Sequence, residues 1–112
     1  MRAGELRHIL RLERRQEAQD GYGAPAETWA VEGRARGAVR PLGVVERAEA
    51  ARKYGEVTHL VRLRGRHLKL SAAKRFVYED PRVDADRILE IVGIMDYDER
   101  GRELRVMCKE AQ

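Results

Sequence analysis

Few side chains of this 112-residue chain have the types and spacing that catalysis or metal binding requires. The histidines are His8, His59 and His67, and no two of them lie three or four residues apart, so no helix could present a pair of them to a metal ion. Ser71 is the only serine, and no Gly-x-Ser-x-Gly nucleophile motif surrounds it. The sequence therefore predicts no enzyme, no metal site and no cofactor.

The remaining reactive side chains are more typical of a protein core than of a catalytic or metal-binding site. His8 and His59 fall on the apolar side of alternating segments, which is typical of histidines in a core or an interface. Cys108 alternates inward with Leu104 and Val106, so we expect a small buried hydrophobe rather than a nucleophile. A lone cysteine also cannot form an intramolecular disulfide, which favours folding in a reducing cytoplasm.

The composition favours one modest domain, residues 1–112. Hydrophobic residues make up 43% and charged residues 38%, and the net charge is +4 with the two signs interspersed. The N-terminal MRAGELRHIL has no apolar run of a signal peptide, and no stretch reaches the length of a membrane span. These features indicate no membrane partner and give only weak support to a dedicated nucleic-acid binder.

Most of the chain alternates with a period of two, which predicts β-strands. A further stretch, Arg87–Met95, is apolar on both sides and predicts a central strand followed by a turn at Asp96–Gly101. The other predicted strands are Leu6–Glu13, Thr28–Arg40, Val57–Arg64, a short one at His67–Ala73, Lys74–Asp80 and Glu103–Lys109. Glycines inside Thr28–Arg40 indicate bends or close backbone approach.

Two segments break this alternation. Arg14–Glu27 is polar and shows no period, so we predict a long mobile loop that docks a partner. The candidate docking residues are Gln16, Asp20, Gly21, Tyr22, Gly23 and Pro25. Leu42–Tyr54 repeats apolar residues every three positions and ends before Gly55, which predicts a helix. Its stripe of small residues favours docking on protein over a membrane surface. The predicted fold is mainly β: a small β-barrel or sandwich with one inserted α-helix and long loops.

Arginines gather on the outer sides of two predicted strands. A solvated face explains them, and so does a surface passed by DNA or paired with glutamates of a neighbouring subunit. The candidate interface residues are Arg34, Arg36, Arg40, Arg62 and Arg64.

In order and length, these motifs resemble the phage head–tail joining, or head-closure, family. The opening MRAGELRHIL is similar to that family's first strand, and a polar glycine-containing loop, Trp29 and Ala38-Val39-Arg40-Pro41 follow. A charged helix spanning Glu46 to Lys53 comes next. Thr58-His59-x-Val61-x-Leu63-Arg64 and a closing hairpin from Arg87 to Glu110 complete the resemblance.

The resemblance implies a structural virion protein of the neck. Members form a ring, often of twelve subunits, beneath the portal and its adaptor. The ring closes the DNA-filled head and provides the surface to which a tail-completion or tail-terminator protein attaches. We expect non-specific contact with packaged double-stranded DNA, and assembly in the cytoplasm of the bacterial host.

On this view the region Pro41–Glu56 lies toward the channel, where Arg47, Arg52 and Lys53 meet phosphates or neighbouring acids. A small OB-type nucleic-acid-binding barrel is the alternative, and it requires exposed aromatics on a basic face. A small hydrolase is a third possibility, which the lack of a nucleophile–base pair disfavours.

Overall fold

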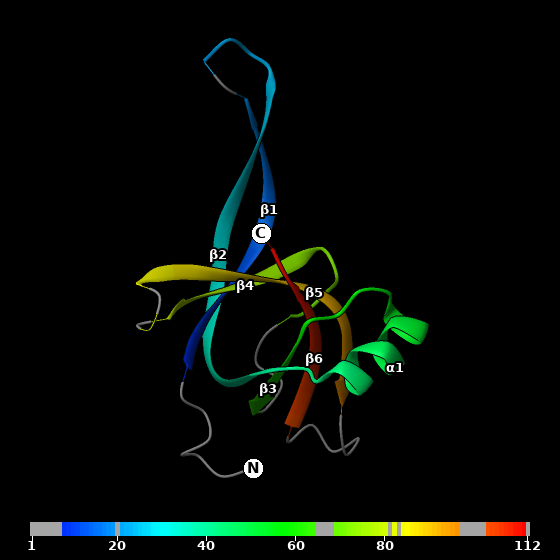
Figure 1. Cartoon of the computed structure of the whole chain (residues 1–112). Coiled ribbons are helices and arrows are strands. Elements are labelled where there is room, and N and C mark those ends of the chain that lie inside the picture. The colour runs from blue at the N-terminus through cyan, green and yellow to red at the C-terminus, as the bar shows by residue number, and fades with distance from the viewer. Residues whose placement is uncertain are drawn as a thin grey trace.

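The computed structural model describes residues 8–19, 21–64, 69–80, 82, 84–96 and 103–111. Six β-strands and one α-helix follow one another in this part of the chain (Figure 1). Their bounds are β1 His8–Gln19, β2 Pro25–Pro41, α1 Val44–Tyr54, β3 His59–Arg64, β4 Lys74–Asp80, β5 Ala85–Asp96 and β6 Glu103–Glu110. The fold is mainly β, as the alternation of side chains predicts.

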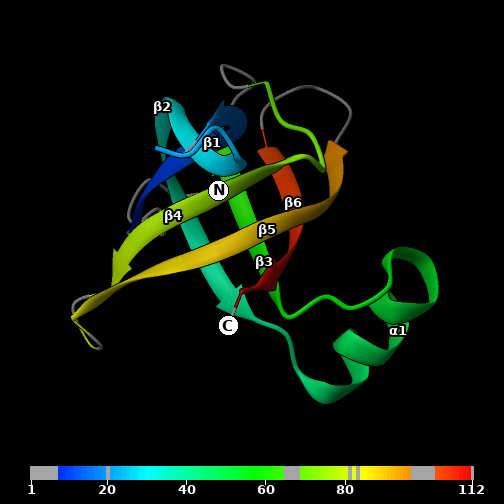
Figure 2. The ribbon, with the colours of Figure 1, turned by 90° about the horizontal axis from the view of Figure 1, so that it is seen from above.

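The strands close into one antiparallel barrel in the order β1-β2-β3-β6-β5-β4 (Figure 2). The hairpins β1–β2, β4–β5 and β5–β6 join strands that are also neighbours in sequence, while α1 lies in the connection between β2 and β3. A short seam between β1 and β4 closes the ring, from Arg11 opposite Val77 to Arg14 opposite Lys74. Of the two predicted architectures, barrel and sandwich, the structure is therefore the barrel.

The core fills the barrel with side chains that alternate inward from every strand. Leu104, Val106 and Cys108 of β6 are buried, as their spacing predicts. The central cluster consists of Leu10, Leu12, Ala35, Val61, Leu63, Phe76, Tyr78, Leu89, Ile91, Leu104, Val106 and Cys108. The core leaves no room for a side chain at Gly37, since a Cβ there would lie 2.7 Å from Leu10 Cδ1 and 2.8 Å from Leu63 Cδ2. The predicted close approach within this strand is thus confirmed.

The predicted strands agree with the observed ones except in two places. Lys74–Asp80 matches β4 to the residue. The predicted loop Arg14–Glu27 is wrong over residues 14–19 and 25–27, which belong to β1 and β2, and only residues 21–24 form the turn between them. The predicted strand His67–Ala73 is wrong over residues 69–73, which form no strand; its first two residues lie outside the described part. Here the Lys74 amide donates to the Ser71 carbonyl at 3.1 Å, in a turn that leads into β4. The turn predicted after Asp96 also lies outside the described residues.

The predicted helix Leu42–Tyr54 is observed as α1, Val44–Tyr54, with a glycine at each end. Gly43 precedes the helix, and its amide donates to Glu46 Oε1 at 3.3 Å. Gly55 has a φ of 81°, a left-handed conformation that favours glycine, and its amide donates to the Ala51 carbonyl at 3.2 Å. The helix therefore ends at the predicted residue and begins two residues later than predicted.

Candidate interaction surfaces

The first hairpin extends beyond the barrel as a two-stranded ribbon (Figure 1). Residues 15–19 of β1 and 25–29 of β2 form this ribbon, and among the described residues they have ladder partners only in each other. Arg15 pairs with Glu27 across the ribbon at 2.8 Å. The Thr28 hydroxyl donates to the Gln16 carbonyl at 2.9 Å. The polar segment read as a loop is thus regular structure with solvent on both faces.

Trp29 attaches the ribbon to the barrel wall. The Arg75 guanidinium carbon lies 4.0 Å from the centre of the Trp29 ring, and the Arg15 guanidinium carbon lies 5.8 Å from it on the ribbon side. Arg75 is itself held by Glu13, with 2.9 Å from Nε to Oε1. A cation over an indole face is a favourable contact. These contacts therefore fix the direction in which the ribbon leaves the barrel.

The structure spreads the predicted docking residues over the outer ribbon. Gln16 lies within β1, and Pro25 is the first residue of β2. Gly21, Tyr22 and Gly23 form the tip, where Tyr22 is 99% exposed and Gly23 has a φ of 81°. Asp20 lies outside the described residues. The tip presents a large aromatic side chain to solvent, which suits a docking role.

α1 lies beside the barrel and buries none of its residues (Figure 2). Arg40 of β2 holds it by a two-pronged contact with Glu46, 2.8 Å and 2.9 Å, which lowers the pKa of that carboxyl to about 2. At its other end, Tyr54 lies over Gly93, where an added Cβ would approach the ring to 2.6 Å. Val44 and Val45 are 87% and 70% exposed. The apolar stripe of the helix is therefore not used to pack against this barrel.

The three predicted channel cations point in different directions around α1. Arg47 lines a cavity of about 660 Å³ between the helix and the barrel end, together with His59 and Glu110. Lys53 lies with its ammonium group 5.4 Å from the centre of the Tyr54 ring, and Arg52 is exposed. Successive helical residues are about 100° apart, so these three cannot share one face.

The predicted arginine faces occupy adjacent strands of the barrel wall. Arg34 and Arg36 are exposed on β2, and neither has an ion pair with any described residue. Arg62 of β3 stands opposite Arg105 of β6, and Arg64 stands opposite Glu103. Arg40 differs from the other four arginines because it already forms an ion pair with Glu46 of the same chain.

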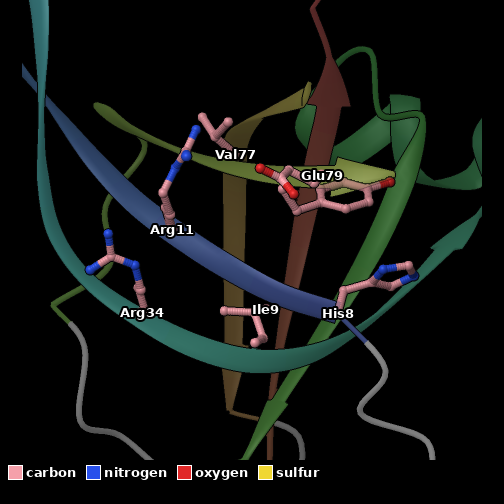
Figure 3. A pocket seen from close by; sticks show the side chains of 7 residues that line it. His8, Ile9, Arg11, Arg34, Val77 and Glu79 are labelled. Carbon is pink, nitrogen blue, oxygen red and sulfur yellow. The ribbon is translucent and has the colours of Figure 1, made fainter. Parts of the chain in front are cut away.

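A surface hollow of about 590 Å³ lies along the outer side of β1 (Figure 3). Arg11 and Arg34 lie at one end, His8 at the other and Ile9 between them. Val77, Tyr78 and Glu79 of β4 complete the lining. Ile9 is 56% exposed, so the hollow offers an apolar centre between charged rims.

A polar network joins the ends of four strands near the same end of the barrel as α1. Asp80, 2% exposed, accepts from Arg87 Nη1 at 3.1 Å and from the backbone and side chain of Arg82. Arg87 also donates to both carboxylate oxygens of Glu110 and, at 3.2 Å, to His59 Nε2. Arginine has no acceptor atom, so His59 Nε2 must be the unprotonated nitrogen. The His59 Nδ1 proton then points to Thr58 Oγ1, 2.8 Å away.

These contacts perturb the titration of every member. Hydrogen bonds from Arg82 and then Arg87 hold the pKa of Asp80 well below its ordinary value. The Arg87 guanidinium likewise lowers the pKa of Glu110. Burial is the main cause that lowers the pKa of His59, and the charges of Arg87 and Arg47 act in the same direction against Glu110. His59 is therefore a neutral structural acceptor at pH 7. Sequence reasoning placed His59 in the core or at an interface and did not predict this network.

The described residues contain no group of three His, Cys, Asp or Glu side chains that could hold a metal ion. Burial raises the pKa of the Cys108 thiol far above its usual value, and so keeps it protonated. No helix in the described part of the chain is long and apolar enough to cross a membrane.

A small barrel that carries a projecting ribbon and a helix with an exposed apolar stripe has the surfaces of an assembly protein. The phage head completion protein family matches residues 1–111, and the chain belongs to this family. It is thus a structural protein associated with the phage head.

Two solved structures share the fold. Protein SF1141 from Shigella flexneri 2a is 22% identical, with a TM-score of 0.73, and the match covers 99% of this chain and 97% of that one. A chain from the virion of a native gene transfer agent particle is 17% identical, with a TM-score of 0.55, over 94% of this chain and 96% of that one. No curated protein matches the sequence.

Proposed function

We propose that this protein forms a ring in the virion neck, beneath the portal or its adaptor, that closes the DNA-filled head and provides the surface for tail attachment. The family match over residues 1–111 carries this proposal, and the similarity in fold to a chain of a gene transfer agent virion supports it. Assembly takes place in the bacterial host cytoplasm, and twelve subunits would match the usual symmetry of such rings.

The ribbon and α1 supply the two working surfaces. The ribbon, with Tyr22 at its tip, reaches away from the barrel toward the portal–adaptor side or toward the tail-completion protein. The segment Pro41–Glu56, which includes α1, lies toward the channel. Because their side chains point in different directions, Arg47, Arg52 and Lys53 divide between phosphates of the packaged double-stranded DNA and acids of neighbouring subunits.

The arginines of the barrel wall contribute to contacts between subunits. Arg34 and Arg36 have no ion pairs within the described chain, so a neighbour's carboxylates can reach them. Ring symmetry repeats each such contact, and modest interfaces then sum to a firm assembly.

A reconstitution tests the proposal. Purified protein is mixed with portal–adaptor complexes of the phage or prophage that encodes it, and the mixture is imaged by electron microscopy. An added ring of density on the side away from the head is the expected result. Particles assembled without this protein should in turn contain DNA that leaks and should lack tails. Portal complexes that never gain density, together with tailed and filled particles in the absence of the protein, would refute the proposal.

The OB-type alternative receives no support from the aromatic residues that the structure describes. Tyr22 lies at the ribbon tip, Trp29 lies under Arg75, and Phe76 and Tyr78 are buried in the core. A row of exposed rings for stacking bases is therefore missing from the described surface.

A further inference from the structure

Two apolar features of the described surface lie on opposite sides of the barrel. α1 projects on one side, with Val44 and Val45 facing solvent. The hollow along β1 lies on the other side, with Ile9 exposed at its centre. Figures 1 and 2 both place α1 away from the first part of β1. One side therefore carries a protrusion and the other a recess.

We propose that α1 of one subunit seats in the β1 hollow of the next subunit, and that this contact builds the ring. The proposal rests on the proposed function, since it names the surface through which copies of this chain join. A protrusion and a recess at different places make a head-to-tail contact, which closes into a ring when the rotation between copies permits. A two-fold dimer would instead need one self-complementary patch.

Burial of side chains within α1 identifies the face that would enter the hollow. Ala50 and Tyr54 are half-buried toward the barrel, whereas Val44, Val45 and Ala48 are exposed. Positions 44, 45, 48 and 52 share one side of a helix, because residues three or four apart lie one above the other. This side presents two valines and an alanine to a neighbour whose recess has Ile9 at its centre and Val77 in its wall. Removing these apolar surfaces from water favours the contact.

The charges around the two surfaces are complementary. On α1, Glu49 lies one turn after Val45 and Arg52 one turn after Ala48, and Arg34 and Glu79 stand on the two rims of the hollow. Each of these four side chains is exposed, and none has an ion pair with any described residue. One orientation places Glu49 beside the neighbour's Arg34 and Arg52 beside the neighbour's Glu79. With Arg52 at the interface, Arg47 and Lys53 remain as the cations closest to the channel.

Covalent trapping tests the geometry directly. The double variant Ile9→Cys/Val45→Cys carries both halves of the contact in one chain, on sides too far apart to bond to each other. After mild oxidation of portal-bound rings, a non-reducing gel should show a ladder from dimer up to the full ring. Each single variant is the matched control and should show no ladder. Dimers without higher bands from the double variant would mean a two-fold contact, and a bond to a portal or tail protein would mean a different partner; either result overturns the proposal.

Charge reversal tests the pairing. Arg34→Glu and Glu49→Arg should each reduce the fraction of portal complexes that carry a ring by roughly tenfold, because every interface gains a like-charge pair. The double variant Arg34→Glu/Glu49→Arg restores opposite charges and should recover the ring. Arg14→Glu is the control, since Arg14 is an exposed arginine of β1 that neither lines the hollow nor has an ion pair with any described residue.

The outcomes separate this inference from the proposed function. Rings that form normally in both single-reversal variants, or that the double variant fails to recover, reject the α1–hollow contact while the ring itself stands. A wild-type chain that forms no ring on portal complexes rejects the proposed function. Circular dichroism and the unfolding midpoint of each variant show that a lost ring does not reflect a lost fold.

Discussion

Arg87 of β5 holds Glu110 at the end of β6 by two parallel hydrogen bonds, 2.8 Å from Nε to Oε1 and 2.9 Å from Nη2 to Oε2. The same guanidinium reaches Asp80, the last residue of β4, at 3.1 Å. One side chain thus joins the ends of three strands at the barrel rim. The two-pronged geometry is specific to arginine, because a lysine ammonium cannot reproduce the planar fork.

The first prediction concerns this rim. Arg87→Met should lower the free energy of unfolding by about 3 kcal/mol, because it leaves partly buried carboxylates without their main partner. Arg87→Lys should give a smaller loss. Urea unfolding followed by circular dichroism measures both. Arg52→Met, at an exposed position of α1, is the control and should change little. An unchanged midpoint for Arg87→Met would show that Arg82 and water compensate fully.

The second prediction concerns the loss of folding stability at acid pH. The pKa of His59 is lowered in the fold, so the unfolded chain binds a proton at that residue before the folded chain does. The contribution of neutral His59 to stability is complete above the ordinary histidine pKa of about 6.5 and is lost as the pH falls through the lower folded value. Wild-type protein should therefore become less stable between pH 7 and pH 5. The carboxylates Asp80 and Glu110 add their own loss only at lower pH, because their pKa values are lowered from ordinary acidic values.

His59→Gln isolates that effect. A glutamine carbonyl can accept from Arg87 in place of Nε2 but does not titrate in this range. The variant should keep most of the stability at pH 7 and show a flatter dependence between pH 7 and pH 5, measured by thermal unfolding at each pH. A slope equal to that of the wild type would assign the acid sensitivity to another group.

The third prediction concerns the ribbon. Trp29→Ala removes the ring under Arg75, a contact of about 1 kcal/mol, and should loosen the ribbon without unfolding the barrel. Amide hydrogen exchange should accelerate in residues 15–19 and 25–31, while amides of β3 and β6 stay protected. Tyr22→Ala at the tip should leave these rates unchanged. Equal acceleration throughout the barrel would mean that Trp29 is part of the core rather than a fastening for the ribbon.

The fourth prediction concerns the place of α1. Gly93→Ala adds a Cβ that would lie 2.6 Å from the Tyr54 ring, so the end of α1 must move away from β5. Because α1 buries no residue, we expect a change in tyrosine environment by near-ultraviolet circular dichroism or NMR, with little loss of global stability. Gly21→Ala, where nothing lies within 4 Å of an added Cβ, is the matched control. Tyr54 signals that do not shift would contradict the contact.

The fifth prediction concerns DNA. Particles that carry Arg47→Ala, Arg52→Ala and Lys53→Ala together should retain less packaged DNA, and the loss should grow with salt because phosphate contacts weaken as counterions compete. DNA content per purified particle measures the effect, with Lys69→Ala as a control at an exposed lysine outside α1. Full retention in rings of normal occupancy would remove α1 from the channel wall.

The sequence predicted those elements whose two faces meet different surroundings. Strands such as Glu103–Lys109 face the core on one side, so their alternation is visible and their bounds are nearly correct. Arg14–Gln19 and Pro25–Glu27 face water on both sides of the ribbon, so no apolar alternation marks them and they were mistaken for a loop. The helix was predicted from its period and from Gly55 at its end, but its apolar stripe could not show whether this barrel or another molecule would cover it.

The rim network was mostly missed because its members are far apart in sequence. His59 was predicted to lie in the core or at an interface, but no local pattern marked Asp80, Arg87 and Glu110 as its partners. Only the pairing of β4 with β5 and of β5 with β6 brings these side chains together. Local patterns carry no information about such a meeting of strand ends.

β1 and β2 run without interruption from the ribbon into the barrel, so the projection and the wall are one pair of strands. A force applied at Tyr22 would be transmitted along both strands, past the contact of Trp29 with Arg75. It would reach the four-residue pairing of β1 with β4, which closes the barrel. A partner that pulls on the tip would therefore load the pairing that keeps the barrel closed.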